Sequence, residues 1–160
     1  EFEAVLKDLY ILSLFLPMVV AAGGNTGGQA STMVIRAMAL GELDKGELWR
    51  VAWKELRLGL MLGSLLGLGM AIITVSFVPS FEVFAEMMPA HIGFTQFACA
   101  IAIALAIQIT SSTLVGSLLP IGARAANIDP AIIAAPAITT IVDVSGMVIY
   151  FFVAKAILGL

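Results

Sequence analysis

Four long stretches of this chain are apolar and nearly free of charge, and they constrain its fold more than any other feature. They cover residues 9–35, 58–78, 93–119 and 131–154, and Asp143 is the one charged residue among them. A helix crosses the hydrocarbon core of a bilayer with about 20 apolar residues. The stretches do not alternate as barrel strands do. We therefore expect an all-α, polytopic transmembrane helical bundle, with residues 1–160 forming one membrane domain.

The composition excludes several other classes of protein. Hydrophobic residues make up 61% of the chain and charged residues only 12%. In soluble domains, about half of the residues are apolar and about a quarter are charged. Eight Lys and Arg stand against eleven Asp and Glu, so a basic nucleic-acid-binding surface is not expected. The expected surroundings are a lipid bilayer, and the expected location is a prokaryotic plasma membrane.

Basic residues are unevenly divided between the connections, and this division predicts the orientation. Six belong to the connections after the first and third stretches: Arg36, Lys45, Arg50, Lys54, Arg57 and Arg124. The connection at 79–92 has none, and Lys7 and Lys155 mark the chain ends. We expect the two basic connections in the cytoplasm and both ends outside. Because no leader sequence precedes the first stretch, we also expect a further span before Glu1.

Small and polar residues inside two of the stretches are typical of contacts between helices. Gly59, Gly63 and Gly67 recur every four residues on one face of the second stretch, and small residues let two helices approach closely. The third stretch carries Gln108 and a polar run at 110–113. For these side chains we favour hydrogen bonding between helices over contact with a substrate.

Asp143 is the residue that most strongly indicates function. An ionised carboxylate at the centre of a membrane helix costs roughly 2.5–3.5 kcal/mol, and no Lys, Arg or His in another stretch can pair with it. It is either a neutral acid bonded to a carbonyl, part of a proton relay, or a carboxylate that meets a permeating cation in water. We favour the cation, because a relay requires several carboxylates and only one is present.

The helix face around Asp143 favours a hydrated ion. Steps of three and four residues place mostly small or polar residues on that face: Ala135, Pro136, Thr139, Gly146 and Tyr150. Pro136 cannot donate a backbone hydrogen bond, which leaves the carbonyl of Ile132 free. Carbonyl and carboxylate oxygens are ligands of hard divalent cations such as Mg²⁺ and Ca²⁺.

A glycine-rich segment at residues 23–29 is the second candidate element of a pathway. Four glycines within six residues are expected to break or distort a helix, and irregular backbone at membrane depth must be buried or line water. Asn25, Thr26 and Gln29 add polar groups there. Close helix packing is the open alternative. A phosphate-binding loop is not expected, because no Lys follows the glycines.

Enzymatic chemistry is not expected. His91 is the one histidine and lies at the outer boundary of the membrane. An intramembrane aspartyl protease needs two facing carboxylates, and one chain supplies only Asp143 at that depth. Two Asp143 residues that meet across a dimer axis would supply both, so geometry alone leaves this alternative open.

Several motifs together resemble the MgtE family of Mg²⁺ channels and transporters. The resemblance rests on Pro17-Met18, on residues 23–29, on Arg36-Ala37 with Gly41-Glu42, on Asp129-Pro130-Ala131, and on residues 139–143. It extends over essentially the whole chain. The resemblance implies a homodimeric membrane domain of five helices per subunit, with a pore between the subunits lined by the helices matching 9–35 and 131–154.

The resemblance also implies roles for particular residues. Asp143 matches the central pore aspartate, Thr139 a main-chain carbonyl ligand, and Asp129 the acidic residue of the inner mouth. Gly28 stands where relatives often have Asn. The first helix of the family and its cytoplasmic N-terminal and CBS domains, which sense Mg²⁺ in many relatives, are expected to be absent from this chain.

Together these observations predict a homodimer that conducts Mg²⁺ as its transported ion into the cytoplasm. Two Asp143 carboxylates bind a largely hydrated ion, because Mg²⁺ releases its water reluctantly. Asn25, Thr32 and Thr139 are candidates for the pore wall, with Ala135, Pro136 and Gly146 as further lining residues. The alternatives are a carrier that exchanges Mg²⁺ for Na⁺ or H⁺, and a non-transporting membrane assembly domain.

Overall fold

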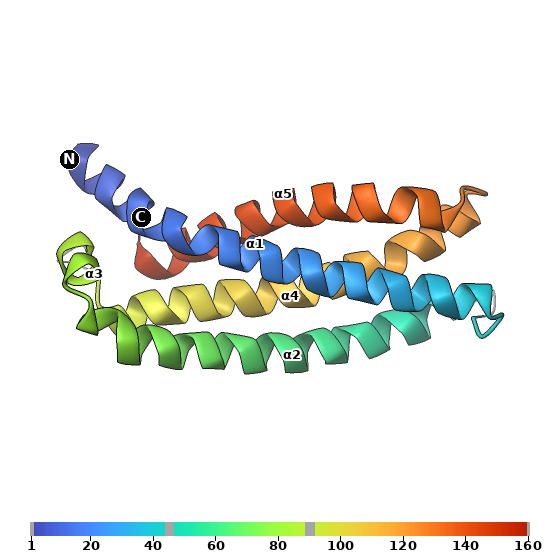
Figure 1. The fold of residues 1–160 in the computed structure, drawn as a ribbon, viewed down its shortest axis with the longest axis horizontal. Helices are drawn as coiled ribbons and strands as arrows, with labels where there is room; N and C mark the ends of the chain where they lie inside the picture. Colours follow the sequence, from blue (N-terminus) through green and yellow to red (C-terminus); the bar gives the residue numbers. More distant parts are fainter. Residues whose placement is uncertain (1, 44–46, 89–91, 160) are drawn as a thin grey trace.

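The computed structural model describes residues 2–43, 47–88 and 92–159, and these ranges form helices without any strand. Four helices are long: α1 (Phe2–Ala39), α2 (Leu48–Phe77), α4 (Phe94–Ala125) and α5 (Pro130–Leu158). A 3₁₀ turn, η1 (Val78–Ser80), and the short helix α3 (Glu82–Met87) follow α2. The prediction of an all-α bundle is confirmed (Figure 1).

Four of the described helical segments are long and apolar enough to cross a membrane. They are Tyr10–Ala39, Leu48–Ser80, Phe94–Ala125 and Pro136–Leu158. The stretches expected from the sequence overlap these helices, and the helices continue beyond them by up to ten residues, as α2 does at its start. The extra length lies at the charged ends, where hydrophobicity no longer marks a helix.

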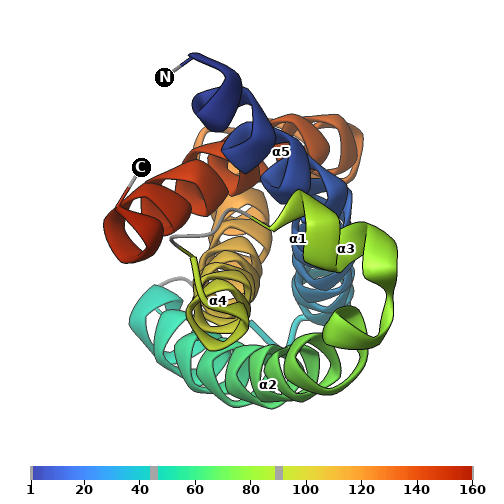
Figure 2. The same cartoon turned by 90° about the vertical axis from the view of Figure 1, so that its left-hand side faces the viewer.

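The long helices run up and down, so that consecutive helices are antiparallel (Figure 1). The end of α1 and the start of α5 lie at one end of the bundle, whereas α3 and both termini lie at the other. Viewed along the bundle, α4 lies between the other three long helices (Figure 2), and it contacts all of them. The helix that carries Gln108 is therefore central to the fold.

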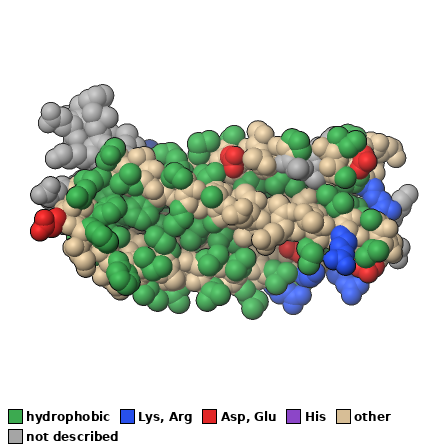
Figure 3. Space-filling view, in the orientation of Figure 1, with side chains coloured by type: hydrophobic (Ala, Val, Ile, Leu, Met, Phe, Trp, Pro, Cys, Tyr) green, Lys and Arg blue, Asp and Glu red, His purple; other side chains and the backbone are tan. Residues whose placement is uncertain are grey.

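Charge and hydrophobicity separate along the bundle (Figure 3). Lys and Arg side chains gather at the end that holds the α1–α2 and α4–α5 connections, while hydrophobic side chains cover the middle of the visible face. Many large apolar side chains of α2 are exposed, as Met61 and Leu65 are. We call the end with the basic residues the inner end, following the orientation that the charge bias predicts.

The glycine stripe of α2 packs directly on α4, as its spacing predicts. A Cβ atom on Gly63 would lie 2.7 Å from the carbonyl oxygen of Ala106, and one on Gly67 would lie 2.7 Å from that of Ala102. These distances are too short for a real contact, so only glycine allows the two backbones to approach this closely. The prediction of a close helix contact is confirmed.

The glycine-rich segment of α1 does not break the helix, contrary to the expectation from its sequence. Residues 23–29 are helical throughout, and so is Pro17. Gly23 and Gly27 face α4: a Cβ on Gly27 would lie 3.0 Å from the carbonyl oxygen of Ser112, and one on Gly116 would strike the backbone of Gly27. Packing against neighbouring helices thus holds a sequence of low helix propensity in a regular helix.

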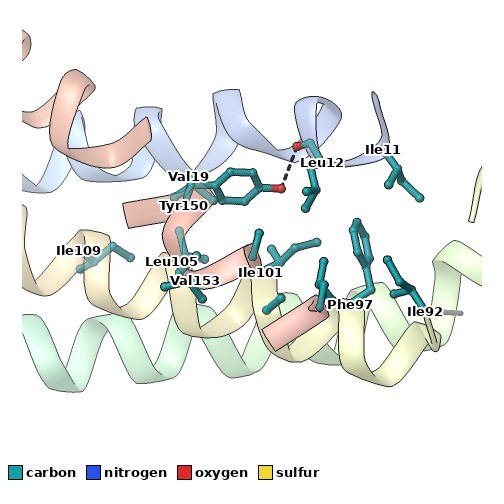
Figure 4. Close-up of a cluster of buried hydrophobic side chains, with 14 residues drawn as sticks. Ile11, Leu12, Val19, Ile92, Phe97, Ile101, Leu105, Ile109, Tyr150 and Val153 are labelled. Carbon is teal, nitrogen blue, oxygen red and sulfur yellow. Dashed lines mark hydrogen bonds between the residues drawn. The ribbon is translucent and has the colours of Figure 1, made fainter. Parts of the chain in front are cut away.

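The outer half of the bundle is a closed apolar core (Figure 4). Phe97 and Ile101 of α4 are fully buried there, and the Tyr150 hydroxyl donates to the Leu12 carbonyl oxygen at 2.8 Å. Phe15 and Phe97 meet edge to face, with ring centroids 5.4 Å apart. Tyr150 therefore lies in the core, although the sequence placed it on the water-lined face of Asp143.

We predict that Gly63→Ala destabilises the bundle. The added methyl group must push the α2 and α4 backbones apart, and overpacking of this kind costs about 1–3 kcal/mol. Thermal unfolding of the purified protein in detergent, followed by circular dichroism, measures the effect.

The matched control is Gly69→Ala, because a Cβ at Gly69 meets nothing within 4 Å. Alanine is a better helix former than glycine by about 1 kcal/mol, so the control is expected to unfold at an equal or higher temperature. Equal unfolding temperatures for the two variants would contradict the close contact.

Candidate functional site

A groove of about 990 Å³ opens between the inner halves of α1 and α5. Helix α1 lines it with Asn25, Gly28, Thr32 and Arg36, among others, and α5 lines it with Ala131, Ile138 and Thr139. Asn25, Gly28, Thr32 and Arg36 share one helix face because they follow one another at steps of three and four residues. The groove therefore lies along the side of α1 that points away from α4, opposite Gly23 and Gly27, which contact α4.

The groove brings together three residues that the sequence predicts for a pathway wall. The side chains of Asn25, Thr32 and Thr139 are all exposed, and each lines the groove. The Thr32 hydroxyl donates to the Gly28 carbonyl oxygen at 2.9 Å. A Cβ atom at Gly28 would meet nothing within 4 Å, so the missing side chain leaves open space beside this bond.

Asp143 lies one helical turn beyond Thr139 along α5, toward the outer end, and is not among the residues that line the groove. Its side chain is half-buried, and its neighbour Val142 is fully buried. No group of three His, Cys, Asp or Glu side chains in the described parts of the chain is placed to hold a metal ion.

Asp129 caps the inner end of α5. Its carboxylate Oδ1 accepts a hydrogen bond from the Ala131 backbone N–H at 2.9 Å, and Pro130 occupies the first turn. An acidic side chain at this place also interacts favourably with the helix dipole. Asp129 is exposed and precedes Ala131, which lines the groove, by two residues; its place at an inner mouth stays a prediction.

The three remaining candidates on α5 do not share one environment. Pro136 is exposed and lies within the helix. Ala135 belongs to α5, but its side chain lies outside the described part of the chain. Gly146 is buried, and a Cβ there would lie 2.7 Å from Nε2 of Gln108. This side of α5 is therefore exposed near its inner end, at Pro136, and buried in the core farther toward the outer end, at Gly146.

Two further residues bear on the site, although the sequence does not predict them as parts of it. Arg36 lines its inner end, although the charge pattern assigned it to a connection. Its four-residue spacing from Thr32 could have indicated the shared face. Gln108 donates to the Val142 carbonyl oxygen at 2.9 Å, and only the three-dimensional arrangement places that contact beside Asp143.

Comparison with known proteins finds one family across most of the chain. The profile of the MgtE family, described as divalent cation transporters, matches residues 16–153. The "Magnesium transporter MgtE" of Thermus thermophilus is 33% identical over 98% of this chain, and that of Bacillus subtilis is 31% identical over 97%. A relative of the same name from Enterococcus faecalis is 28% identical over 97%. The chain spans only 31–32% of the length of these relatives.

We predict that two substitutions distinguish the capping oxygen of Asp129 from its negative charge. Asp129→Ala removes the cap of α5, and loss of an N-cap costs about 0.5–2 kcal/mol. Asp129→Asn keeps a capping oxygen and removes the charge, so its unfolding temperature should stay close to that of the unchanged protein. Thermal unfolding in detergent measures both variants, and an Asn variant as unstable as the Ala variant would contradict the capping role.

Proposed function

The chain belongs to the MgtE family of divalent cation transporters, and from this membership we propose that it forms a membrane pathway through which Mg²⁺ enters the cytoplasm. It is a multi-pass integral membrane protein, in keeping with four helices able to cross a membrane. The observation that carries the proposal is the groove between α1 and α5, because it exposes polar side chains on helices that are otherwise apolar.

The polarity of the groove argues for water inside it. The Asn25 side chain is exposed in the single chain, at a depth where lipid hydrocarbon offers its amide no hydrogen bond. An amide side chain within a membrane segment is hydrogen-bonded to another helix or to water. A second copy of the chain that covers this groove encloses a hydrated path and removes the exposure to lipid.

Asp143 is the proposed ion site on this path. A second Asp143 from the partner copy doubles the negative charge that a divalent cation meets, and the cation in turn offsets the cost of burying each carboxylate. Because Mg²⁺ releases its water reluctantly, the ion is held through its own water shell. Binding through water stays weak enough for the ion to leave.

The inner end of the groove combines opposite charges. Asp129 attracts a cation there, whereas Arg36, which lines the groove, repels it. Both side chains are exposed, so salt and water screen them strongly at physiological ionic strength. Selection for a cation therefore rests on the more buried Asp143, where screening is weaker.

We predict that Asp143→Asn lowers Mg²⁺ entry at least about tenfold, which corresponds to a loss of about 1.4 kcal/mol of interaction with the ion. Asparagine keeps the shape of the side chain and removes its charge. Mg²⁺ entry into proteoliposomes, followed with an entrapped fluorescent indicator, measures the rate.

Glu47→Gln is the matched control, because Glu47 forms a surface ion pair with Arg50 at 2.9 Å and such pairs contribute little. Entry through the unchanged protein no faster than through protein-free liposomes would favour a non-transporting assembly domain, and unchanged entry in the Asp143 variant would contradict Asp143 as the ion site. Entry that stops without an opposing Na⁺ or H⁺ gradient would identify an exchanger in place of a channel.

We also predict that a cysteine at Thr32 reacts with a water-soluble methanethiosulfonate reagent in the reconstituted protein. Thiolates form in water and not in hydrocarbon, so the rate reports hydration. The exposed native Cys99 is first replaced by serine.

Leu68→Cys is the comparison, because Leu68 is 62% exposed on the apolar outer face of α2. The Thr32 variant should react at least about tenfold faster, and Mg²⁺ should slow its reaction. Equal reaction rates at the two positions would contradict a hydrated groove.

A further inference from the structure

We propose that Gln108 of α4 is a positioning residue that holds Asp143 at the ion pathway, an inference that rests on the proposed function. Gln108 is fully buried at the meeting point of α1, α4 and α5. Its Nε2 donates to the backbone carbonyl oxygen of Val142 at 2.9 Å. Val142 directly precedes Asp143, so the hydrogen bond attaches α4 to the backbone immediately beside the carboxylate.

Two glycines make room for this side chain. A Cβ on Gly146 of α5 would lie 2.7 Å from Nε2 of Gln108, and a Cβ on Gly23 of α1 would strike the same amide. Gly146 lies one helical turn after Val142, so the amide occupies a recess beside the carbonyl that it binds. The recess is formed by the backbones of two helices and fits a long, narrow side chain.

The hydrogen bond determines both the rotation and the level of α5 against α4. Lipid tails are as apolar as the side chains between helices, so apolar contact alone sets register weakly in a membrane. A directional bond to one carbonyl removes that freedom. Successive residues of a helix point about 100° apart; with Val142 turned into the core, Asp143 is turned toward the edge of the core, where its side chain is half-buried.

The chemistry of Gln108 also argues against a purely space-filling role. Its Oε1 is buried and has no hydrogen-bond partner among the described residues. A buried acceptor without a partner is destabilising, and an apolar side chain of equal size avoids that cost. The amide is therefore better explained by the carbonyl that it holds than by the volume that it fills.

The chain contains a matched comparison for this bond. Gln96, also on α4, donates from Nε2 to the carbonyl oxygen of Ile157 at 2.7 Å. Both bonds join α4 to α5 through the same chemical groups. Gln96, however, lies near the outer end of the bundle, 12 residues before Gln108 in the sequence. Loss of the Gln96 bond removes a link between the same two helices without touching the backbone beside Asp143.

The test compares Gln108→Met with Gln96→Met in the full chain reconstituted in liposomes. Methionine conserves the length of the side chain and removes the donor. We expect Gln108→Met to raise the half-saturating Mg²⁺ concentration about three- to tenfold, with a smaller change in the maximal rate. Gln96→Met should leave the half-saturating concentration unchanged.

Thermal unfolding with and without Mg²⁺ supplies an independent readout. A stabilising shift produced by Mg²⁺ should shrink in Gln108→Met and persist in Gln96→Met. If both variants lose thermal stability alike and keep the wild-type Mg²⁺ dependence, Gln108 is only a structural link and the proposal is overturned.

A second variant covers the case in which Gln108→Met fails to fold. Gly146→Ala places a methyl group against Nε2 and should displace the amide while leaving Gln108 in place, so it should raise the half-saturating concentration in the same direction. An unchanged value in that variant overturns the proposal. The unchanged protein separates the two hypotheses: if its Mg²⁺ entry does not exceed that of protein-free liposomes, the proposed function itself is wrong. If entry is present but Asp143→Asn leaves it intact, Asp143 is not the ion site and the positioning role of Gln108 is overturned.

Discussion

A polar group inside a bilayer must be hydrogen-bonded by the protein or hydrated, and the rest of this structure depends on that constraint. Between the helices, the protein supplies the partners: Thr26 and Ser112 share a hydrogen bond of 2.9 Å, and Gln108 binds the backbone of α5. Such short links require backbones that nearly touch. Glycines at the helix crossings supply that proximity, because any Cβ there would collide with the neighbouring helix.

The same constraint divides the bundle into two halves with different properties. The outer half closes around an apolar core, in which the Tyr150 hydroxyl is satisfied by the Leu12 carbonyl. The inner half opens as the α1–α5 groove, where Asn25 and Thr32 are exposed without protein on one side. Along α5, Asp143 lies between Thr139, which lines the groove, and Gly146, which is buried.

Sequence patterns predicted the contacts of α2 but misjudged part of α1 and α5. The spacing of Gly59, Gly63 and Gly67 indicates a contact by itself, since a period of four residues defines one helix face. Residues 23–29 mislead for the opposite reason: their low helix propensity is a local property, and packing against α4 outweighs it. Tyr150 was assigned to the face of Asp143 because the helix period cannot show where α5 leaves the groove and enters the core.

The sequence by itself determined the all-α membrane class, the number of apolar stretches, the family and the prominence of Asp143. These properties follow from the length and hydrophobicity of continuous segments and from one charge among apolar residues, all of which are local. Only the tertiary structure decided that Arg36 lines the groove, that Gly146 is buried and that Gln108 holds the backbone beside Asp143. Those outcomes depend on where helices cross, and a crossing is determined jointly by residues far apart in the chain.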